Sequence, residues 1–423
     1  MAEFEAIDRR AGLPPVALYV HVPFCVSVCP YCDFVVYAGA ATRGPTNRVD
    51  LFIAALATEI GLRADAADAA FGSPGRGRRA RAGRPPLESL YFGGGTPSLL
   101  PADTLARLVE LVRERFGLAA GAEITLEANP GPDERGDPAA QRRAGIGRIS
   151  FGAQSLDPTE LKRLGRRHRP ADVGAAVDGA RAAGIGSINL DLLYDLPDVP
   201  LTGWMETLEA ALALGPDHLS LYALTIDDPD AEGLTGFDGD HLPTRPGARR
   251  WREAVRPGQD EDRAAAEYHH AVHRLADDGW RGYEISNWAR PGHEGRHNLA
   301  YWERRPYEAA GPGAHAFDGV VRRWNAARID RYHRALIPPD GGPPSLPPGG
   351  EEVIDPATAA VERIVLGLRT DRGVELAAGY EPPLADWFGW ALAAELLDVT
   401  ADERIVLTTR GRLLSNELFS RLI

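Results

Sequence analysis

Three cysteines form the most chemically informative pattern in this chain of 423 residues, within the segment Cys25-Val-Ser-Val-Cys29-Pro-Tyr-Cys32. An odd number of thiols cannot pair fully into intramolecular disulfides, and these three lie too close together to close a stabilising loop. Thiolates are ligands for zinc and for iron. The pattern therefore predicts reduced cysteines that hold a metal.

Two kinds of metal site fit this segment. A closed tetrahedral zinc site needs a fourth ligand, which His21 could supply. The three thiolates can instead hold an iron–sulfur cluster, and three ligands on a four-iron cluster leave one iron open for chemistry. The spacing of the cysteines alone leaves both readings open.

Other polar groups follow later candidate strands. Residues 91–98 read Tyr-Phe-Gly-Gly-Gly-Thr-Pro-Ser, and glycines let the backbone approach a ligand closely, although a tight strand-to-helix turn also needs them. Glu127 and Asp191 lie near buried strand ends, where unpaired charges are seldom found. With Gln154 they suit a cationic, polyhydroxylated ligand; the alternative is a structural ion pair.

The elements that must position these residues alternate between short β-branched or aromatic runs and longer helical patterns. This alternation is typical of βα units around a parallel sheet, whose active groups sit at the strand carboxyl ends. The predicted strands are 16–22, 89–92, 123–128, 148–153, 187–193 and 218–224. The predicted helices between them are 48–68, 102–116, 139–144, 171–183 and 202–214. Six strands at this spacing favour an α/β fold of the partial (β/α)6 barrel type.

Domain boundaries follow from composition. The barrel is expected at 1–225, an α+β extension at 226–335 and a small C-terminal domain of winged-helix-like type at 351–423. Gly, Pro and Arg crowd three segments, which we predict to be inserted surface loops: 72–86, 227–262 and 338–350. The first of these is Arg-rich, which indicates a solvated loop or a docking surface for an acidic partner. Beyond the second insertion, we expect a helix near 263–277 and a strand at 282–288.

Composition limits the partners. The formal net charge of -13 argues against nucleic-acid binding and against an anionic membrane surface, because both need clustered basic charge. The first residues, Met-Ala-Glu-Phe-Glu, lack the basic start and apolar region of a signal peptide. With reduced cysteines, these features predict a cytoplasmic protein.

The C-x3-C-x2-C loop after the first strand resembles the signature of the radical S-adenosylmethionine superfamily. The resemblance implies a [4Fe-4S] cluster on Cys25, Cys29 and Cys32, with S-adenosylmethionine chelating the fourth iron. Electron transfer to the sulfonium then yields a 5′-deoxyadenosyl radical. The glycine-rich stretch resembles the one that holds the methionine end of this ligand.

Motif order and wording across most of the chain, through Asp191-Leu-Leu-Tyr-Asp-Leu-Pro197 and Gly367-Leu-Arg-Thr370, resemble the oxygen-independent coproporphyrinogen III oxidase group. By this likeness the chain carries a set of S-adenosylmethionine contacts and one residue beside the cluster, Tyr31. The contacts are Tyr19, Gly94, Gly95, Thr96, Glu127, Gln154, Arg166 and Asp191.

Within this group the sequence is closer to the haem chaperone (HemW) branch than to the oxidases. The oxidases carry a further cysteine two residues beyond the third, where this chain has Phe34, and a longer N-terminal arm. The segment His297-Asn-Leu-Ala-Tyr301-Trp302 resembles that branch's haem motif, and an imidazole can ligate haem iron while aromatics cover the porphyrin. A histidine packed among aromatics is the alternative, and His315 is a rival ligand.

The resemblance implies that the protein binds haem and transfers it to a membrane-associated acceptor protein. A radical enzyme acting on a porphyrinogen is the second hypothesis, and a zinc-binding module is the third. The sequence leaves open whether the chain forms a homodimer.

Overall fold

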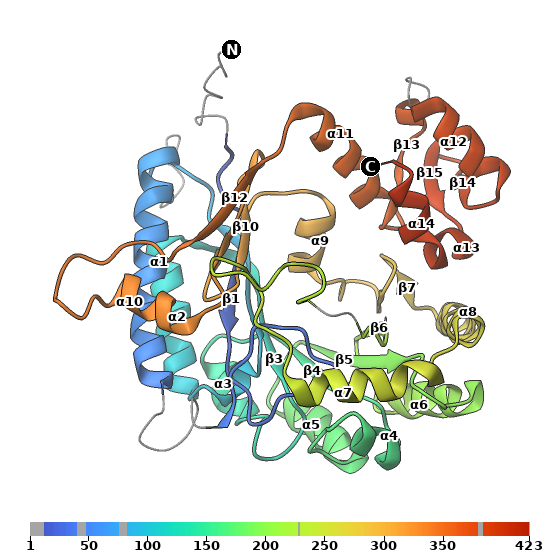
Figure 1. Ribbon diagram of the computed structural model, residues 1–423, viewed down its shortest axis with the longest axis horizontal. Coiled ribbons are helices and arrows are strands. Elements are labelled where there is room, and N and C mark those ends of the chain that lie inside the picture. The colour runs from blue at the N-terminus through green and yellow to red at the C-terminus, as the bar shows by residue number, and fades with distance from the viewer. Residues whose placement is uncertain (1–11, 40–47, 76–82, 227–228, 380–383, 423) are drawn as a thin grey trace.

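A long, mostly parallel sheet organises the computed structural model, which describes residues 12–39, 48–75, 83–226, 229–379 and 384–422 (Figure 1). Six neighbouring parallel strands follow in chain order: β1 (Ala17–Val22), β2 (Leu87–Gly94), β3 (Leu118–Ala128), β4 (Arg148–Gln154), β5 (Ser187–Tyr194) and β6 (His218–Ala223). All six predicted strands are present, and the α/β partial-barrel prediction is confirmed.

The connecting helices form the outer layer of this barrel. They are α1 (Val49–Phe71), α2 (Ala102–Arg115), α3 (Pro138–Arg143), α4 (Pro158–Arg163), α5 (Pro170–Ala182) and α6 (Leu201–Ala213), with a 3-10 turn, η4 (Pro97–Leu99), after β2. The five predicted helices are confirmed, and α4 was missed. Asp157 caps this helix by accepting from the N–H groups of Thr159 and Glu160, a signal of a helix start that the prediction did not use.

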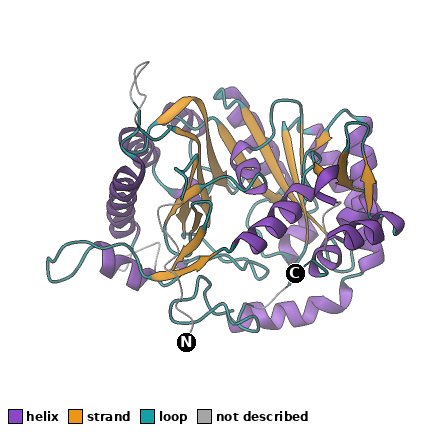
Figure 2. Cartoon of the chain, turned by 90° about the horizontal axis from the view of Figure 1, so that it is seen from above, coloured by secondary structure: helices purple, strands orange, loops and turns teal. Residues whose placement is uncertain are grey.

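The residues after the barrel extend the same sheet at both edges. At one edge β9 (Tyr307–Ala310) pairs parallel with β1, and three antiparallel strands continue from it: β10 (His315–Phe317), β11 (Val321–Asn325) and β12 (Gly349–Val353). At the other edge β8 (Asn287–Ala289) pairs antiparallel with β6, and β7 (Arg281–Gly282) pairs with β8. The strand predicted at 282–288 is therefore wrong, because this segment turns back on itself. The strands together form a curved wall in the view from above (Figure 2).

The remaining helices of the extension are α7 (Pro246–Val255), α8 (Glu261–Asp277), α9 (Arg296–Trp302) and α10 (Ile329–Leu336), with a 3-10 turn, η5 (Arg256–Gly258). The prediction of an inserted loop over 227–262 is wrong where α7 and η5 lie and where α8 begins. The predicted insertion 338–350 likewise ends inside β12. Arg76, Arg78, Arg79 and Arg81 of the Arg-rich loop lie outside the described residues, whereas Arg84 is buried and pairs with Asp68 at 3.0 Å.

The C-terminal segment builds its own small core around Leu368, Phe388, Ile405 and Leu418. Its elements are α11 (Pro356–Leu368), β13 (Val374–Glu375), η6 (Leu376–Gly379), α12 (Leu384–Ala393), β14 (Leu397–Val399), β15 (Arg404–Leu407), α13 (Thr409–Leu413) and α14 (Ser415–Ser420). The three strands form a separate sheet in the order β13-β15-β14. An isolated β-bridge between Glu284 and Thr370 joins this segment to the extension.

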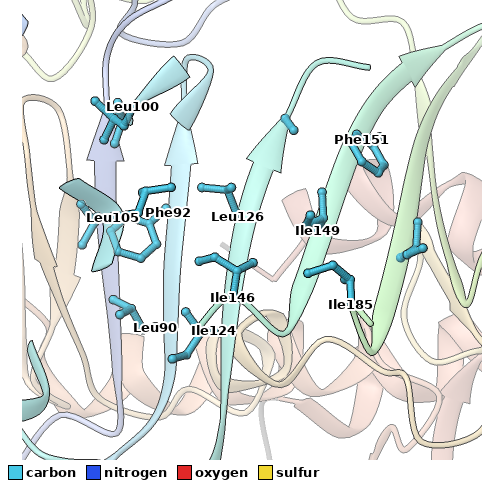
Figure 3. Packing of buried hydrophobic residues seen from close by; sticks show 14 of the residues in the cluster. Leu90, Phe92, Leu100, Leu105, Ile124, Leu126, Ile146, Ile149, Phe151 and Ile185 are labelled. Atoms are coloured by element: carbon cyan, nitrogen blue, oxygen red, sulfur yellow. The ribbon is translucent and has the colours of Figure 1, made fainter. Parts of the chain in front are cut away.

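Side chains along the barrel strands alternate between an apolar face, which packs against the helices, and a polar face inside the barrel. Leu90, Phe92, Leu126, Ile149 and Phe151 are buried against the helices (Figure 3). Successive side chains of a strand point to opposite faces, so the residues between them face the inside of the barrel. These inward residues are Tyr91, Glu127 and Ser150, followed on β5 and β6 by Asp191 and Ser220. The sheet therefore presents one polar face to a cleft.

Within the described residues, the structure has no helix that is both long and apolar enough to cross a membrane.

Candidate functional site

A cleft of about 830 Å³ opens at the carboxyl ends of the barrel strands. This is in the size range of sites for cofactors and other small molecules. Every predicted site residue except Trp302 lines it: Tyr19, Cys25, Cys29, Tyr31, Cys32, Gly94, Gly95, Thr96, Glu127, Gln154, Arg166, Asp191, His297 and Tyr301. Residues of the C-terminal segment, Arg369 and Arg412 among them, line it too.

The cysteine loop follows β1 at the mouth of this cleft. Cys25 is buried, and Cys29 and Cys32 are partly exposed; all three are free thiols. Backbone hydrogen bonds shape the loop, from the Cys25 N–H to the Tyr37 carbonyl (3.0 Å) and from the Cys32 N–H to the Cys29 carbonyl (3.2 Å). The segment is thus folded back on itself and presents its thiols from one short loop.

Helix α7 is hydrogen-bonded to the backbone of the cysteine loop through Arg252. The guanidinium of Arg252, which is 4% exposed, donates to the carbonyls of Pro30 (3.2 Å), Tyr31 (3.4 Å) and Cys32 (3.1 Å). A planar guanidinium with five donors can satisfy several carbonyls at once. Arg252 was not among the predicted site residues, and no sequence signal distinguishes it from its Arg neighbours.

Two side chains donate directly to cysteine sulfur. The Thr96 hydroxyl lies 3.5 Å from Cys25 Sγ, and Arg166 Nη1 lies 3.4 Å from Cys29 Sγ. Nη2 of Arg166 also donates to Asn129 Oδ1 and to the Gly152 carbonyl, at the ends of β3 and β4. Donors aimed at sulfur stabilise thiolates, so this arrangement fits ligands of a metal cluster.

The protonation state of the thiols also affects which metal group they can bind. Burial raises the pKa of Cys25 to about 11 and that of Cys32 to about 12. In the absence of a cation these thiols stay protonated at neutral pH, whereas iron or zinc deprotonates a thiol that coordinates it. No three His, Cys, Asp or Glu side chains in the described ranges converge closely enough to bind one metal ion.

His21 does not contribute to such a site. Its Nε2 donates to the Val35 carbonyl at 2.8 Å, and its Nδ1 accepts from the Tyr19 hydroxyl at 3.1 Å. Burial lowers the pKa of His21 to about 4, so the ring is neutral. Both ring nitrogens are therefore already bonded, and His21 as the fourth zinc ligand is wrong in this structure.

The glycine-rich stretch packs against the cysteine loop. Gly94 has a left-handed φ of 108°. At Gly95, a Cβ would lie 2.7 Å from the Phe24 carbonyl oxygen, closer than real Cβ contacts allow. The sequence suggested close approach to a ligand; the structure shows that Gly95 is also needed for contact with the chain's own backbone.

Glu127, on the neighbouring strand β3, is hydrogen-bonded to the glycine-rich stretch. One carboxylate oxygen accepts from the Gly94 N–H at 2.9 Å, and the other accepts from the Tyr91 hydroxyl at 2.8 Å. Burial raises the pKa of Glu127 to about 7, opposed by the Tyr91 hydrogen bond. Burial also raises the pKa of Asp191, which accepts from Ser150 (3.1 Å) and Asn189 (2.7 Å). Neither carboxylate has a basic partner within ion-pair distance among the described residues, which favours the cationic-ligand reading over a structural ion pair.

Gln154, at the end of β4, has a strained backbone conformation. Its φ of 68° is left-handed, and the pairing with β5 shifts register between Gly152 and Gln154. Non-glycine residues in this conformation cost energy and cluster at functional sites. Gln154 also lines the cleft.

The segment predicted as a haem motif forms α9 at the amino ends of the barrel strands, where the N–H groups of Arg296 and His297 donate to Glu123 at 3.1 and 3.2 Å. His297 is 2% exposed, and its Nδ1 and Nε2 lie 2.9 Å from Ser89 Oγ and 2.8 Å from the Tyr301 hydroxyl. Burial lowers the pKa of His297 to about 3. Trp302 does not line the cleft; its ring packs under the guanidinium of Arg369, a lining residue, which lies 4.6 Å from the ring centre. The histidine is thus packed in an aromatic cluster with both nitrogens engaged.

The fold and the site together define a radical SAM protein. The model of the Radical SAM superfamily matches residues 76–211. The solved structure of the coproporphyrinogen III oxidase HemN from Escherichia coli, described as a radical SAM enzyme, superposes with a TM-score of 0.75. It covers 97% of this chain and 91% of its own, at 22% identity, so this likeness concerns the fold.

Two curated relatives narrow the class to a family. The heme chaperone HemW of Mycobacterium tuberculosis (strain H37Rv) is 37% identical over 411 residues, which cover 97% of this chain and 95% of the relative. The heme chaperone HemW of Escherichia coli (strain K12) is 38% identical over 323 residues, 75% of either chain. The chain belongs to the HemW family.

Proposed function

We propose that this protein is a haem chaperone that holds a [4Fe-4S] cluster and S-adenosylmethionine and passes haem to an acceptor protein. The observation that carries the proposal is that the three thiols line the same cleft as Glu127 and Asp191, two carboxylates that have no ion-pair partner in the part of the chain that the structure describes. The names of the HemW relatives support haem as the cargo.

Cys25, Cys29 and Cys32 would hold the cluster, with Tyr31 beside it. Thr96 and Arg166 donate to two of the sulfurs, which favours the thiolate form that iron needs. When bound, the cluster supplies an electron to the sulfonium of S-adenosylmethionine. Reconstitution without oxygen is therefore required for any test.

S-adenosylmethionine would lie across the strand ends. Gly94, Gly95 and Tyr19 line the cleft and would contact its methionine end. The carboxylates of Glu127 and Asp191 offset the positive charge of the ligand and accept from its ribose hydroxyls. Gln154 and Arg166 then contact its remaining polar groups.

Haem would enter beside α9, where Tyr301 provides an aromatic face. For His297 to ligate iron, one of its two hydrogen bonds must break and the imidazole must leave a nearly solvent-free position. His297 and Trp302 as haem contacts stay predictions. The acceptor protein and its membrane association are proposed on the family resemblance, and the cytoplasmic location on the reduced cysteines. A homodimer stays a hypothesis.

Anaerobic reconstitution followed by haem titration tests this function. We expect bound iron and acid-labile sulfide, a shifted Soret band and transfer of haem to an apo-haemoprotein. Zinc without acid-labile sulfide would establish the zinc-binding alternative. Release of CO2 from coproporphyrinogen in the presence of reductant would instead establish a porphyrinogen-oxidising enzyme.

A further inference from the structure

A second cavity of about 290 Å³ lies behind the wall of the main cleft. Tyr19, Asp33, Phe34 and Tyr301 line both spaces, so these residues separate the cavity from the proposed cluster site. Phe34, the residue that stands in place of the oxidases' additional cysteine, is 62% exposed. The second cavity is therefore open to solvent, lies beside the cysteine loop and is lined in part by aromatic side chains.

One carboxylate in this cavity holds two imidazoles. Asp240 Oδ1 lies 2.9 Å from His241 Nδ1, and Asp240 Oδ2 lies 2.8 Å from His315 Nε2. A carboxylate accepts hydrogen bonds, so each of these ring nitrogens is the donor, and in the neutral form of each ring the other nitrogen carries a lone pair. The His241 side chain is 29% exposed and that of His315 is 39% exposed.

The two rings differ in which nitrogen is left for a ligand. At His241 it is Nε2, the outer nitrogen, whereas at His315 it is Nδ1, which is crowded by its own Cβ. No hydrogen-bond partner of His241 Nε2 lies among the described residues. A carboxylate that fixes the Nδ1–H tautomer and leaves Nε2 as the donor atom is the usual arrangement behind a metal-bound histidine.

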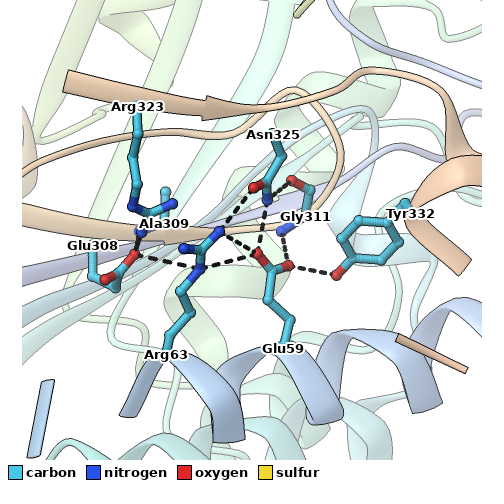
Figure 4. Close-up of polar contacts among 8 residues, drawn as sticks. All are labelled: Glu59, Arg63, Glu308, Ala309, Gly311, Arg323, Asn325 and Tyr332. Carbon is cyan, nitrogen blue, oxygen red and sulfur yellow. Dashed lines mark hydrogen bonds and ion pairs between the residues drawn. The ribbon is translucent and has the colours of Figure 1, made fainter. Parts of the chain in front are cut away.

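The surroundings hold this pair in place. His315 begins β10, and its ring stacks on Trp324 with centroids 6.0 Å apart. The preceding turn is anchored by buried Glu59, which accepts from the Gly311 N–H at 2.8 Å and from the Asn325 amide at 2.7 Å (Figure 4). The loop of Asp240 is tied to the same region, because the Ala327 N–H donates to the Gly239 carbonyl at 2.9 Å. His315 therefore stands on an inner strand of the sheet, and Asp240 and His241 stand on a loop that is hydrogen-bonded to the chain beyond β11.

We propose that His241 is the axial ligand of the haem iron, through Nε2, with Asp240 as the acceptor behind it. This inference rests on the proposed haem-binding function. Tyr301, Tyr307 and Phe34 offer aromatic contacts to a flat macrocycle. The cavity is at the lower end of ligand-site volumes, so part of the porphyrin remains outside, as suits a cargo that must be released. The negative charge of Asp240 compensates the positive charge of ferric haem.

The test is haem binding by reconstituted full-length variants. His241→Ala should lose the Soret spectrum of a nitrogen-ligated haem and weaken binding, and added imidazole should restore that spectrum by occupying the vacated position. Asp240→Asn, which keeps the ligand but weakens its basicity, should lower affinity by about tenfold or more. His269→Ala, which changes an exposed histidine on α8, is the matched control.

The outcomes distinguish a failure of the proposed haem-binding function from a failure of the His241 assignment. If the wild-type protein binds no haem, the proposed function fails. If the wild type binds haem and His241→Ala keeps its spectrum and affinity, the assignment of His241 is wrong while haem binding stands. Loss of the nitrogen-ligated spectrum in His297→Gln with His241→Ala unaffected moves the ligand to α9. Loss of the spectrum in His241→Ala without rescue by imidazole assigns His241 a purely structural role and overturns the inference.

Discussion

The carboxylate of Glu127 and the backbone N–H of Gly94 are joined by a hydrogen bond of 2.9 Å, which ties the end of β3 to the end of β2. The bond places an acidic group beside the glycine stretch and close to the cysteine loop. Because burial raises the pKa of Glu127 to about 7, the charge of this group changes within the physiological range.

Binding of S-adenosylmethionine should therefore strengthen as pH rises. A cationic ligand prefers ionised Glu127, and with a pKa near 7 the ionised fraction grows about tenfold between pH 6 and pH 8. Calorimetric titration of the reconstituted protein should show a gain in affinity of about that size. Glu127→Gln should bind more weakly and with little dependence on pH.

A second variant tests the origin of this dependence. The Tyr91 hydroxyl stabilises the ionised carboxylate, so Tyr91→Phe should raise the pKa of Glu127 and move the gain in affinity to higher pH. A pH profile that is the same in the wild type, Glu127→Gln and Tyr91→Phe would contradict the role given to Glu127.

Gly95→Ala should destabilise the protein. The new Cβ would lie 2.7 Å from the Phe24 carbonyl oxygen and 2.9 Å from the Val22 carbonyl oxygen, and backbone atoms cannot move aside cheaply. Overpacking of this kind costs about 1–3 kcal/mol. Gly147→Ala is the matched control, because a Cβ at Gly147 has no neighbour within 4 Å. Chemical denaturation should show a loss for the first variant and about 0.5 kcal/mol or less for the second.

Arg252→Ala should loosen the cysteine loop without unfolding the barrel. It removes the donors to the carbonyls of Pro30, Tyr31 and Cys32. The reconstituted variant should lose its cluster faster in the presence of a chelator, as followed by visible absorbance. Arg250→Ala, at an exposed position of the same helix, should lose it at the wild-type rate. Equal rates in both variants would show that α7 does not support the loop.

The sequence predicted the barrel well because short β-branched or aromatic runs alternate with longer helical patterns along the chain. Within one such strand, Leu126 joins the core and Glu127 faces the cleft. The predicted site residues came together because parallel strands bring their carboxyl ends to one edge. Trp302 failed to reach the cleft because one position along a short helix turns the side chain about 100°.

The features that the sequence did not reveal depend on long-range contacts. Arg252 reaches the cysteine loop across more than two hundred residues of chain, and Asp240 meets His315 from a loop with no regular pattern. β9 pairs with β1 because the chain returns to the first edge of the sheet after β6. The hydrophobic periodicity of a local segment carries no information about which distant strand or loop that segment contacts.

Acid should destabilise the fold partly through His297. Its pKa is about 3 in the folded protein and about 6.5 when unfolded, so below pH 6.5 the unfolded chain binds the additional proton. The stability that the neutral ring contributes is complete above pH 6.5 and is lost at about 1.4 kcal/mol per pH unit below it. The difference in unfolding free energy between the wild type and His297→Gln should therefore shrink by about 2 kcal/mol from pH 6.5 to pH 5. Ser89→Ala, which removes a neutral partner of the same ring and leaves the titrating group, should differ from the wild type by nearly the same amount at both pH values. A constant difference for His297→Gln across this range would mean that the histidine is not held neutral by its burial.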